Sequence, residues 1–213
     1  MRLFGVGFVA FIVLVLVGKV YMTVTRPATP LPVAKTLDAF APGLQLDEPV
    51  SAARAKLGSL RFVSHMGFVG TNVSRKQAAE YFPQVRLLLT PKWRTKSAKA
   101  AEEAPVDAVE LVSARPYMSG YVAQEVTQTF KANPRMGCVR TSTPGVFREV
   151  AYWTTKNDLG GAVLVHDWKP DAKYDNPGLV VVSLIMYSGP FDGARTLRAD
   201  FVVSDCATLA GTS

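Results

Sequence analysis

An uncharged apolar run at the start of the chain constrains this protein more than any other feature. No residue from Leu3 to Gly18 carries a charge, and Val20 to Val24 continue the run beyond Lys19. As a helix, these roughly 22 residues would extend about 33 Å, enough to cross a bilayer, with the Lys19 ammonium group reaching back toward the interface. We therefore predict a transmembrane anchor over residues 1–24.

A cleaved signal peptide is the alternative interpretation of this run. Its apolar region would span about 7 to 15 residues and be followed closely by a small-x-small cleavage site. The Ala39-Phe40-Ala41 motif lies far beyond Gly18 and precedes Pro42, and no cysteine follows the run to carry a lipid. The sequence therefore favours an uncleaved, single-pass signal anchor.

The flanking charges give two readings of orientation. Arg2 flanks one end of the run, whereas Lys19, Arg26 and Lys35 flank the other, and counting these bases favours a cytoplasmic domain. A very short, positively charged N-terminal tail is instead typical of an exported signal anchor. We expect a membrane protein with its folded domain outside the cytoplasm, and keep the cytoplasm-facing orientation as the alternative.

Prolines and composition divide the rest of the chain. Prolines recur with little periodicity through residues 25–48, which predicts an extended Pro-rich tether. The α+β domain is then expected over 49–206, as one unit or as two lobes, a basic one over 49–99 and a sheet-rich one over 100–206. Residues 207–213 form a tail.

Hydrophobic periodicity places short helices among the first strands. Val50, Ala53 and Leu57 have helical spacing after Pro49, and Gly58 ends the helix. The same signals predict a strand Leu60–Val69, a helix opened by a Ser74-x-x-Gln77 capping box and ended by Pro83, a strand Val85–Thr90, a helical turn or loop Lys96–Pro105, a half-buried strand Val106–Ala114, and a helix capped by Ser119 with Val122, Val126 and Phe130 on one face.

Strand patterns dominate the C-terminal third. Four apolar segments separated by Gly, Pro, Asn and Asp clusters predict sequential antiparallel strands: Glu149–Thr155, Ala162–Trp168, Leu179–Tyr187 and Thr196–Val203. The third of these is apolar at consecutive positions and is therefore expected at the centre of the sheet, buried on both faces. The predicted fold class is α+β, a mostly antiparallel sheet with a few short helices.

A short internal echo favours two related units. The hexapeptide Met66–Thr71 recurs in part as Met136–Thr141, and each copy follows a predicted helix. Coincidence between two strand starts explains the echo equally simply, and the hexapeptide indicates no family.

Positive charge is concentrated in residues 49–99. This segment carries ten bases against the single acid Glu80, a local net charge of +9, whereas residues 100–213 have a net charge of −3. The basic surface candidates are Arg54, Lys56, Arg61, Arg75, Lys76, Arg86, Lys92, Arg94, Lys96 and Lys99. They favour anionic lipid or an acidic partner, with a solvated surface as the alternative, and membrane attachment argues against nucleic acid.

Signatures of catalysis and metal binding are weak. His65 and His166 have no second ligand at helical spacing, and His166 and Asp167 would point to opposite faces of a strand. Asp167, Asp171 and Asp175 with Asn176 form an acidic loop whose spacing does not match an EF-hand. We predict no catalytic residue, metal or cofactor. Asn72-Val73-Ser74 is a glycosylation sequon that matters only in a eukaryotic secretory pathway.

The two cysteines are expected to form a disulfide. Cys138 and Cys206 each lie at the edge of a predicted strand, and a bridge would close a loop of about 70 residues, worth roughly 4 kcal/mol. Such bonds persist outside the cytoplasm. Two independent buried thiols are the alternative, in which case Cys138 with a histidine could form a nucleophile and base, although the local sequence does not favour it.

Together these features predict a membrane-tethered, extracytoplasmic binding or structural domain without an identifiable catalytic site. The alternatives are an extracytoplasmic enzyme with an unrecognised site and a cytoplasm-facing membrane adaptor. The expected partners are the membrane, through the N-terminal helix, and an anionic lipid or acidic partner on residues 49–99.

Overall fold

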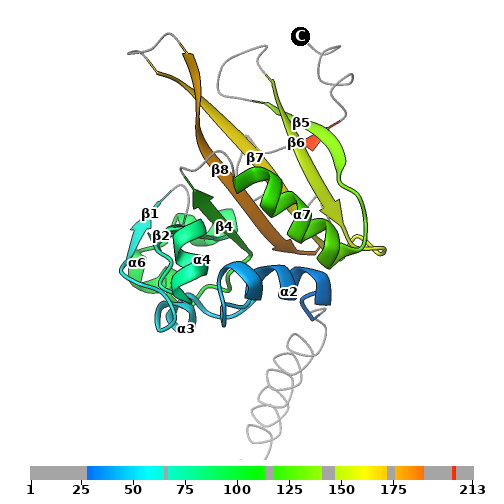
Figure 1. The fold of residues 1–213 in the computed structure, drawn as a ribbon. Helices are drawn as coiled ribbons and strands as arrows, with labels where there is room; N and C mark the ends of the chain where they lie inside the picture. Colours follow the sequence, from blue (N-terminus) through cyan, green and yellow to red (C-terminus); the bar gives the residue numbers. More distant parts are fainter. Residues whose placement is uncertain are drawn as a thin grey trace, which may run out of the picture.

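A computed structural model describes residues 28–64, 67–113, 118–140, 147–171, 176–189 and 203–204. Short helices accompany one antiparallel sheet in these parts of the chain (Figure 1), which confirms the predicted α+β class. The predicted anchor over residues 1–24 lies outside the described residues. Among the helices that are described, none combines the length and the apolar character needed to cross a membrane.

The sheet has the strand order β1-β2-β3-β4-β8-β7-β6-β5-β9. Its strands are β1 (Leu60–Val63), β2 (Gly67–Thr71), β3 (Gln84–Leu88), β4 (Ala108–Ser113), β5 (Arg135–Arg140), β6 (Phe147–Thr154), β7 (Gly160–Asp171), β8 (Asn176–Ser188) and β9 (Val203–Ser204). The helices are α2 (Leu31–Phe40), α3 (Val50–Arg54), α4 (Lys76–Tyr81), α5 (Pro91–Arg94), α6 (Ala98–Ala101) and α7 (Met118–Phe130).

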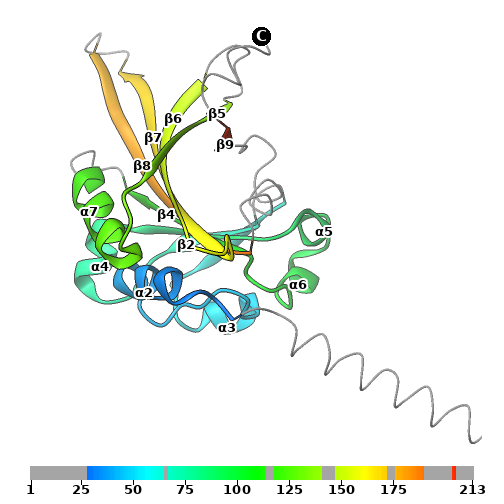
Figure 2. The same cartoon turned by 90° about the vertical axis from the view of Figure 1, so that its right-hand side faces the viewer.

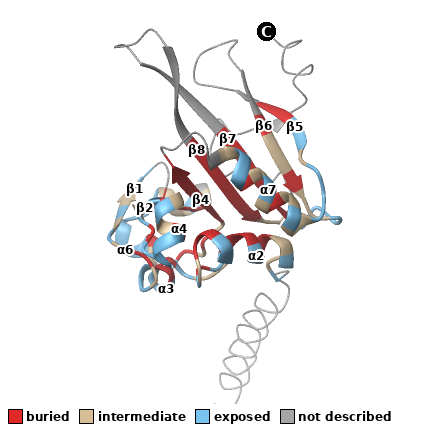
Figure 3. Ribbon diagram, viewed as in Figure 1, coloured by how far each residue is buried: buried red, intermediate tan, exposed pale blue. Residues whose placement is uncertain are grey.

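Two four-stranded meanders meet at the centre of the sheet. Strands β1 to β4 follow one another on one side, β8 to β5 on the other, and β4 pairs with β8, with Glu110 opposite Ile185. Figure 2 shows the second meander rising steeply away from the first. The joining strands are buried on both faces, as predicted for β8, where Val182–Tyr187 are all buried (Figure 3).

Strand β4 corrects the prediction of a half-buried strand over Val106–Ala114. All of its residues, Ala108–Ser113, are buried. Its alternation of polar and apolar residues is misleading because Glu110, one of the polar residues, is buried in an ion pair with the partly buried Arg86 side chain on the neighbouring strand β3.

The predicted tether over residues 25–48 is also wrong in its C-terminal part. Residues 31–40 form α2, whose Val33, Leu37 and Phe40 are buried at helical spacing. The Phe40 ring packs edge-to-face on Phe82, with ring centroids 5.3 Å apart. The prolines mark the ends of the helix, since Pro30 is its N-cap residue and proline is tolerated in a first turn. The core of the domain therefore begins well before residue 49.

The predicted single strand Leu60–Val69 is instead a pair of strands. Strand β1 runs antiparallel to β2, with Val63 opposite Gly67. A continuous apolar pattern does not distinguish one strand from a tight pair, but glycine is required at the start of β2. Gly67 has φ +112°, and a Cβ there would lie 2.3 Å from the Leu87 carbonyl oxygen.

The helices match their predicted positions more closely than their predicted ends. Helix α3 ends at Arg54, although Leu57 beyond it is buried as expected. The capping box is wrong: α4 begins at Lys76 after Arg75, and the Ser74 hydroxyl instead hydrogen-bonds Asn72 Oδ1. Asn72 holds this position because its Nδ2 donates to the Phe40 carbonyl oxygen at 2.9 Å.

The later helices largely follow the prediction. The Ala-rich connector contains α6, where Ser97 Oγ accepts from the Ala100 N–H. Helix α5, which precedes it, was not predicted. Helix α7 buries Val122 and Val126 and packs Phe130 against the core, as predicted. It lies across β6, β7 and β8 and contacts α2 (Figure 1).

The predicted C-terminal strands appear as β6, β7 and β8, in sequential antiparallel order. Strands β7 and β8 are longer than predicted and occupy much of the expected connector Lys169–Gly178, with Asp171 opposite Asn176. Apart from Val203, the predicted strand Thr196–Val203 lies outside the described residues. The two copies of the echo fall on β2 and β5; β5 follows α7, whereas β2 directly follows β1.

Candidate functional site

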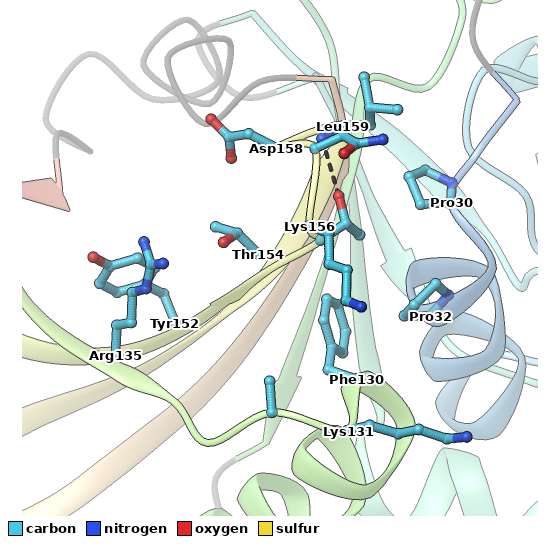
Figure 4. A pocket seen from close by; sticks show the side chains of 13 residues that line it. Pro30, Pro32, Phe130, Lys131, Arg135, Tyr152, Thr154, Lys156, Asp158 and Leu159 are labelled. Atoms are coloured by element: carbon cyan, nitrogen blue, oxygen red, sulfur yellow. Dashed lines mark hydrogen bonds between the residues drawn. The ribbon is translucent and has the colours of Figure 1, made fainter.

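A groove with a volume of about 1010 Å³ opens where the described chain enters the fold. It lies between the start of α2, the end of α7, the first residue of β5 and the turn from β6 to β7 (Figure 4). It is lined by Pro30, Pro32, Phe130, Lys131, Ala132, Arg135, Tyr152, Thr154, Thr155, Lys156, Asn157, Asp158 and Leu159.

Backbone geometry fixes two walls of the groove. Lys131 follows α7 with φ 52°, a left-handed residue that ends the helix and turns the chain toward β5. The β6–β7 turn is held by the Thr155 hydroxyl, which accepts from the Leu159 N–H at 3.0 Å, and by the Thr155 N–H, which donates to the Gly160 carbonyl at 3.0 Å. Both walls therefore present their side chains from tightly constrained backbone.

The entering chain forms the third wall and lies against the start of β7. A Cβ added at Gly160 would lie 3.2 Å from Pro30 Cγ, so glycine allows the proline ring to approach this closely. Larger residues at position 160 would push the start of α2 away from the turn. The position of the groove is thus coupled to the point where the chain enters the domain.

Cations dominate the lining. Lys131, Arg135 and Lys156 are exposed, and no ion pair joins any of them to another described residue, while Asp158 is the lining acid. The start of α2 and the end of α7 carry opposite partial charges that largely offset each other. Side chains therefore make the groove electropositive.

The two aromatic residues of the lining lie on opposite faces of the sheet, because Phe130 packs against the core cluster that holds Trp153 and the buried face of α7, whereas Tyr152 packs against the other cluster. Arg135 and Tyr152 are opposite each other on β5 and β6, and Figure 4 shows the Lys156 side chain pointing toward the Phe130 ring. In the core cluster against which Tyr152 packs, burial raises the pKa of Tyr187 far above its ordinary value, and the charges of Asp158 and Tyr152 raise it further. This tyrosine therefore stays protonated and neutral near neutral pH.

The lining side chains are suited to binding an anion. Two ammonium groups, one guanidinium and the hydroxyls of Thr154 and Tyr152 can donate to phosphate or carboxylate oxygens. The lining contains no histidine or cysteine, and no group of potential metal ligands occurs among the described residues. The groove offers charge and hydrogen-bond donors without an evident nucleophile.

Four of the ten predicted basic surface residues are engaged within the protein. Arg54 pairs with Glu102 at 3.0 Å, Lys56 with Glu48, and Arg86 with Glu110 at 3.1 Å. Arg94 Nε donates to the Leu89 carbonyl oxygen, and burial lowers the pKa of Arg94 while the charge of Asp107 raises it. These side chains stabilise the fold around them.

The other six candidates are exposed but spread over several elements. Arg61 lies on β1, Arg75 and Lys76 at the start of α4, and Lys92, Lys96 and Lys99 on α5, α6 and the turn between them. Figure 2 places α4 at one end of the first meander and α5 with α6 at the other. Binding of an anionic partner to residues 49–99 stays a prediction.

The cysteine prediction is met in part by the described residues. Cys138 is buried and disulfide-bonded, so it presents no thiol for nucleophilic chemistry. It lies opposite Ser204 in the β5–β9 pairing, two residues before the only other cysteine of the chain, Cys206. Because Cys206 lies outside the described residues, the pairing itself stays a prediction.

The remaining candidates contribute little to this site. His65 lies outside the described residues, and His166 and Asp167 occupy adjacent positions of β7, away from the groove lining. Asp171 and Asn176 face each other at the ends of β7 and β8, while Asp175 lies outside the described residues. Asn72 is 3% exposed and hydrogen-bonded to Phe40, so the folded chain does not present the sequon for glycosylation.

Sequence reasoning missed Lys131, Arg135 and Lys156. They come from three elements of a segment with net negative charge, so a running count of charge does not detect them. A usable signal was that Lys156 directly precedes the predicted turn at Asn157-Asp158 and that Lys131 lies two residues before the one at Asn133-Pro134. No protein-family model, curated protein or solved structure matches this chain, so the assignment of the groove depends on its geometry and charge alone.

Proposed function

We propose that this protein is a single-pass membrane protein whose α+β domain lies outside the cytoplasm and binds an anionic ligand in the groove. The observation that carries the proposal is that Lys131, Arg135 and Lys156, none of them in an ion pair with a described residue, line one open groove. Binding rather than catalysis is proposed because the lining supplies cations and hydroxyl groups without a nucleophile and base pair.

The membrane part of the proposal depends on the sequence. The uncharged run Leu3–Gly18 is long enough, with its continuation to Val24, to form an anchor. The disulfide at Cys138 supports a domain outside the cytoplasm, because such bonds are rare inside it.

Membrane attachment and orientation are tested in intact cells or spheroplasts. We expect the full-length chain in the membrane fraction, with its C-terminal domain digested by added protease, and a non-reduced peptide linking Cys138 to Cys206. A soluble main species lacking residues 1–24, or a domain protected from protease until the cells are lysed, would contradict this part of the proposal.

Anion binding is tested on the full-length protein in nanodiscs of neutral lipid. Rates of acetylation at single lysines, measured by peptide mass spectrometry, report directly on the groove. Millimolar inorganic phosphate is expected to slow acetylation of Lys131 and Lys156 but not of Lys96 and Lys99, which are also exposed. Equal rates with and without phosphate would show that the groove does not hold a free anion.

A further inference from the structure

We infer that the groove faces the bilayer and that its ligand is the phosphate groups of anionic lipids in the membrane that holds the anchor. This inference rests on the proposed function, because it identifies the class of anion that the same groove binds. Chain length, charge and exposed apolar residues each support it.

Chain length limits how far the groove can be from the membrane. The predicted anchor ends at Val24, and Pro30 already lines the groove. Six residues span at most about 20 Å even when fully extended. Chain length therefore keeps the edge of the groove at Pro30 within about 20 Å of the end of the predicted anchor.

Charge matches this location. Lys131, Arg135 and Lys156 are exposed at the membrane-proximal end, and an anionic surface attracts bases that come within about 10 Å of it. Arginine forms paired hydrogen bonds with phosphate oxygens, and the lysines add point charges that adapt to neighbouring headgroups. Even with the negative charge of Asp158, the lining of the groove keeps a net positive charge.

Exposed apolar side chains lie beside these cations. Leu159 lines the groove and is 39% exposed, and Leu31, between the lining residues Pro30 and Pro32, is 66% exposed. Apolar side chains next to bases are typical of surfaces that contact the boundary between headgroups and acyl chains. A small soluble anion gives no reason for these leucines to be exposed, whereas a lipid surface does.

The inference is tested with the full-length protein in nanodiscs of neutral lipid and in nanodiscs with about 30% anionic lipid. We expect acetylation of Lys131 and Lys156 to become about fivefold slower in anionic discs, and the effect to disappear in high salt. Lys96 and Lys99 serve as internal controls, since a general effect of surface charge on reactivity would change all four rates together.

Matched triple variants separate the groove from the basic segment. The K131Q/R135Q/K156Q variant is expected to lose the difference in hydrogen exchange of residues 155–160 between anionic and neutral discs. The R61Q/K96Q/K99Q variant removes the same number of lysines and arginines from exposed positions and is expected to retain that difference.

The outcomes distinguish this inference from the proposed function. Protection by inorganic phosphate in neutral discs, without any effect of anionic lipid, would overturn the lipid inference and leave an anion-binding groove. Protection by neither would overturn both. Protection of Lys96 and Lys99 by anionic lipid, with Lys131 and Lys156 unchanged, would overturn the inference in favour of the basic segment.

Discussion

The basic segment 49–99 and the groove use positive charge in different ways. The segment holds ten bases, but Arg54, Lys56 and Arg86 are in ion pairs, and its exposed bases lie on separate elements. The groove is lined by three bases from a segment of net negative charge, and none of them is in an ion pair with a described residue. Fewer charges thus make the stronger candidate for binding.

This difference arises because an ion pair reduces the attraction of a base for other anions. A base that neutralises a nearby carboxylate has little attraction left for a distant anion, and if it is buried its main effect is on folding. An exposed base without a partner contributes little to stability and keeps its field available to a ligand. The two regions should therefore respond oppositely to mutation.

The largest effect is expected for the pair between Arg86 and Glu110. Glu110 is 1% exposed, so Glu110→Ala would leave the partly buried Arg86 guanidinium without its carboxylate. We expect the free energy of unfolding to fall by about 3–5 kcal/mol, measured by chemical denaturation of the full-length protein.

Two variants control this prediction. Glu102→Ala breaks the more exposed pair with Arg54 and is expected to cost no more than about 1 kcal/mol. The double variant R86M/E110L replaces both charges with apolar groups and should recover much of the lost stability. Equal losses for Glu110→Ala and Glu102→Ala would contradict a structural role for the buried pair.

A smaller, pH-dependent effect is expected at Tyr187, in the core cluster against which the groove residue Tyr152 packs. Burial raises the pKa of Tyr187 in the folded state, so above pH about 10 the unfolded chain releases a proton that the folded chain retains. The stabilising contribution is complete below that pH, and stability then falls with rising pH by about 1.4 kcal/mol per unit.

The Tyr187→Phe variant removes this titration. Its denaturation midpoint is expected to decline less steeply than that of the wild type between pH 9 and about 11. Asp158→Asn is expected to leave this slope unchanged, since burial, the larger cause, still holds the pKa of Tyr187 above the tested range. Identical slopes for wild type and Tyr187→Phe would show that Tyr187 does not contribute.

The smallest effect on stability is expected in the groove itself. The K131Q/R135Q/K156Q variant changes three exposed side chains, and we expect the free energy of unfolding to change by less than about 0.5 kcal/mol per substitution. A loss comparable to that of Glu110→Ala would mean that these bases are structural, and the contrast between the two regions would disappear.

The fold was largely predictable where local pattern and final environment agree. The continuous apolar run in β8 predicted a central strand, and Val122 and Val126 predicted the buried face of α7. The prediction failed where a proline or a polar residue is compatible with two different structures. Proline marks the ends of α2 as readily as it marks an extended tether, and Glu110 looks exposed in the sequence because its partner Arg86 is distant along the chain.

The sequence by itself determined the apolar run of Leu3–Val24, the alternation of short helices with strands, and the overall charge. These depend on neighbouring residues, whose spacing can be read directly. Only the tertiary structure decided which bases are paired and which line the groove. Lys131, Arg135 and Lys156 line one groove because α7 ends, β5 begins and the β6–β7 turn lies at one edge of the fold, an arrangement that no local pattern encodes.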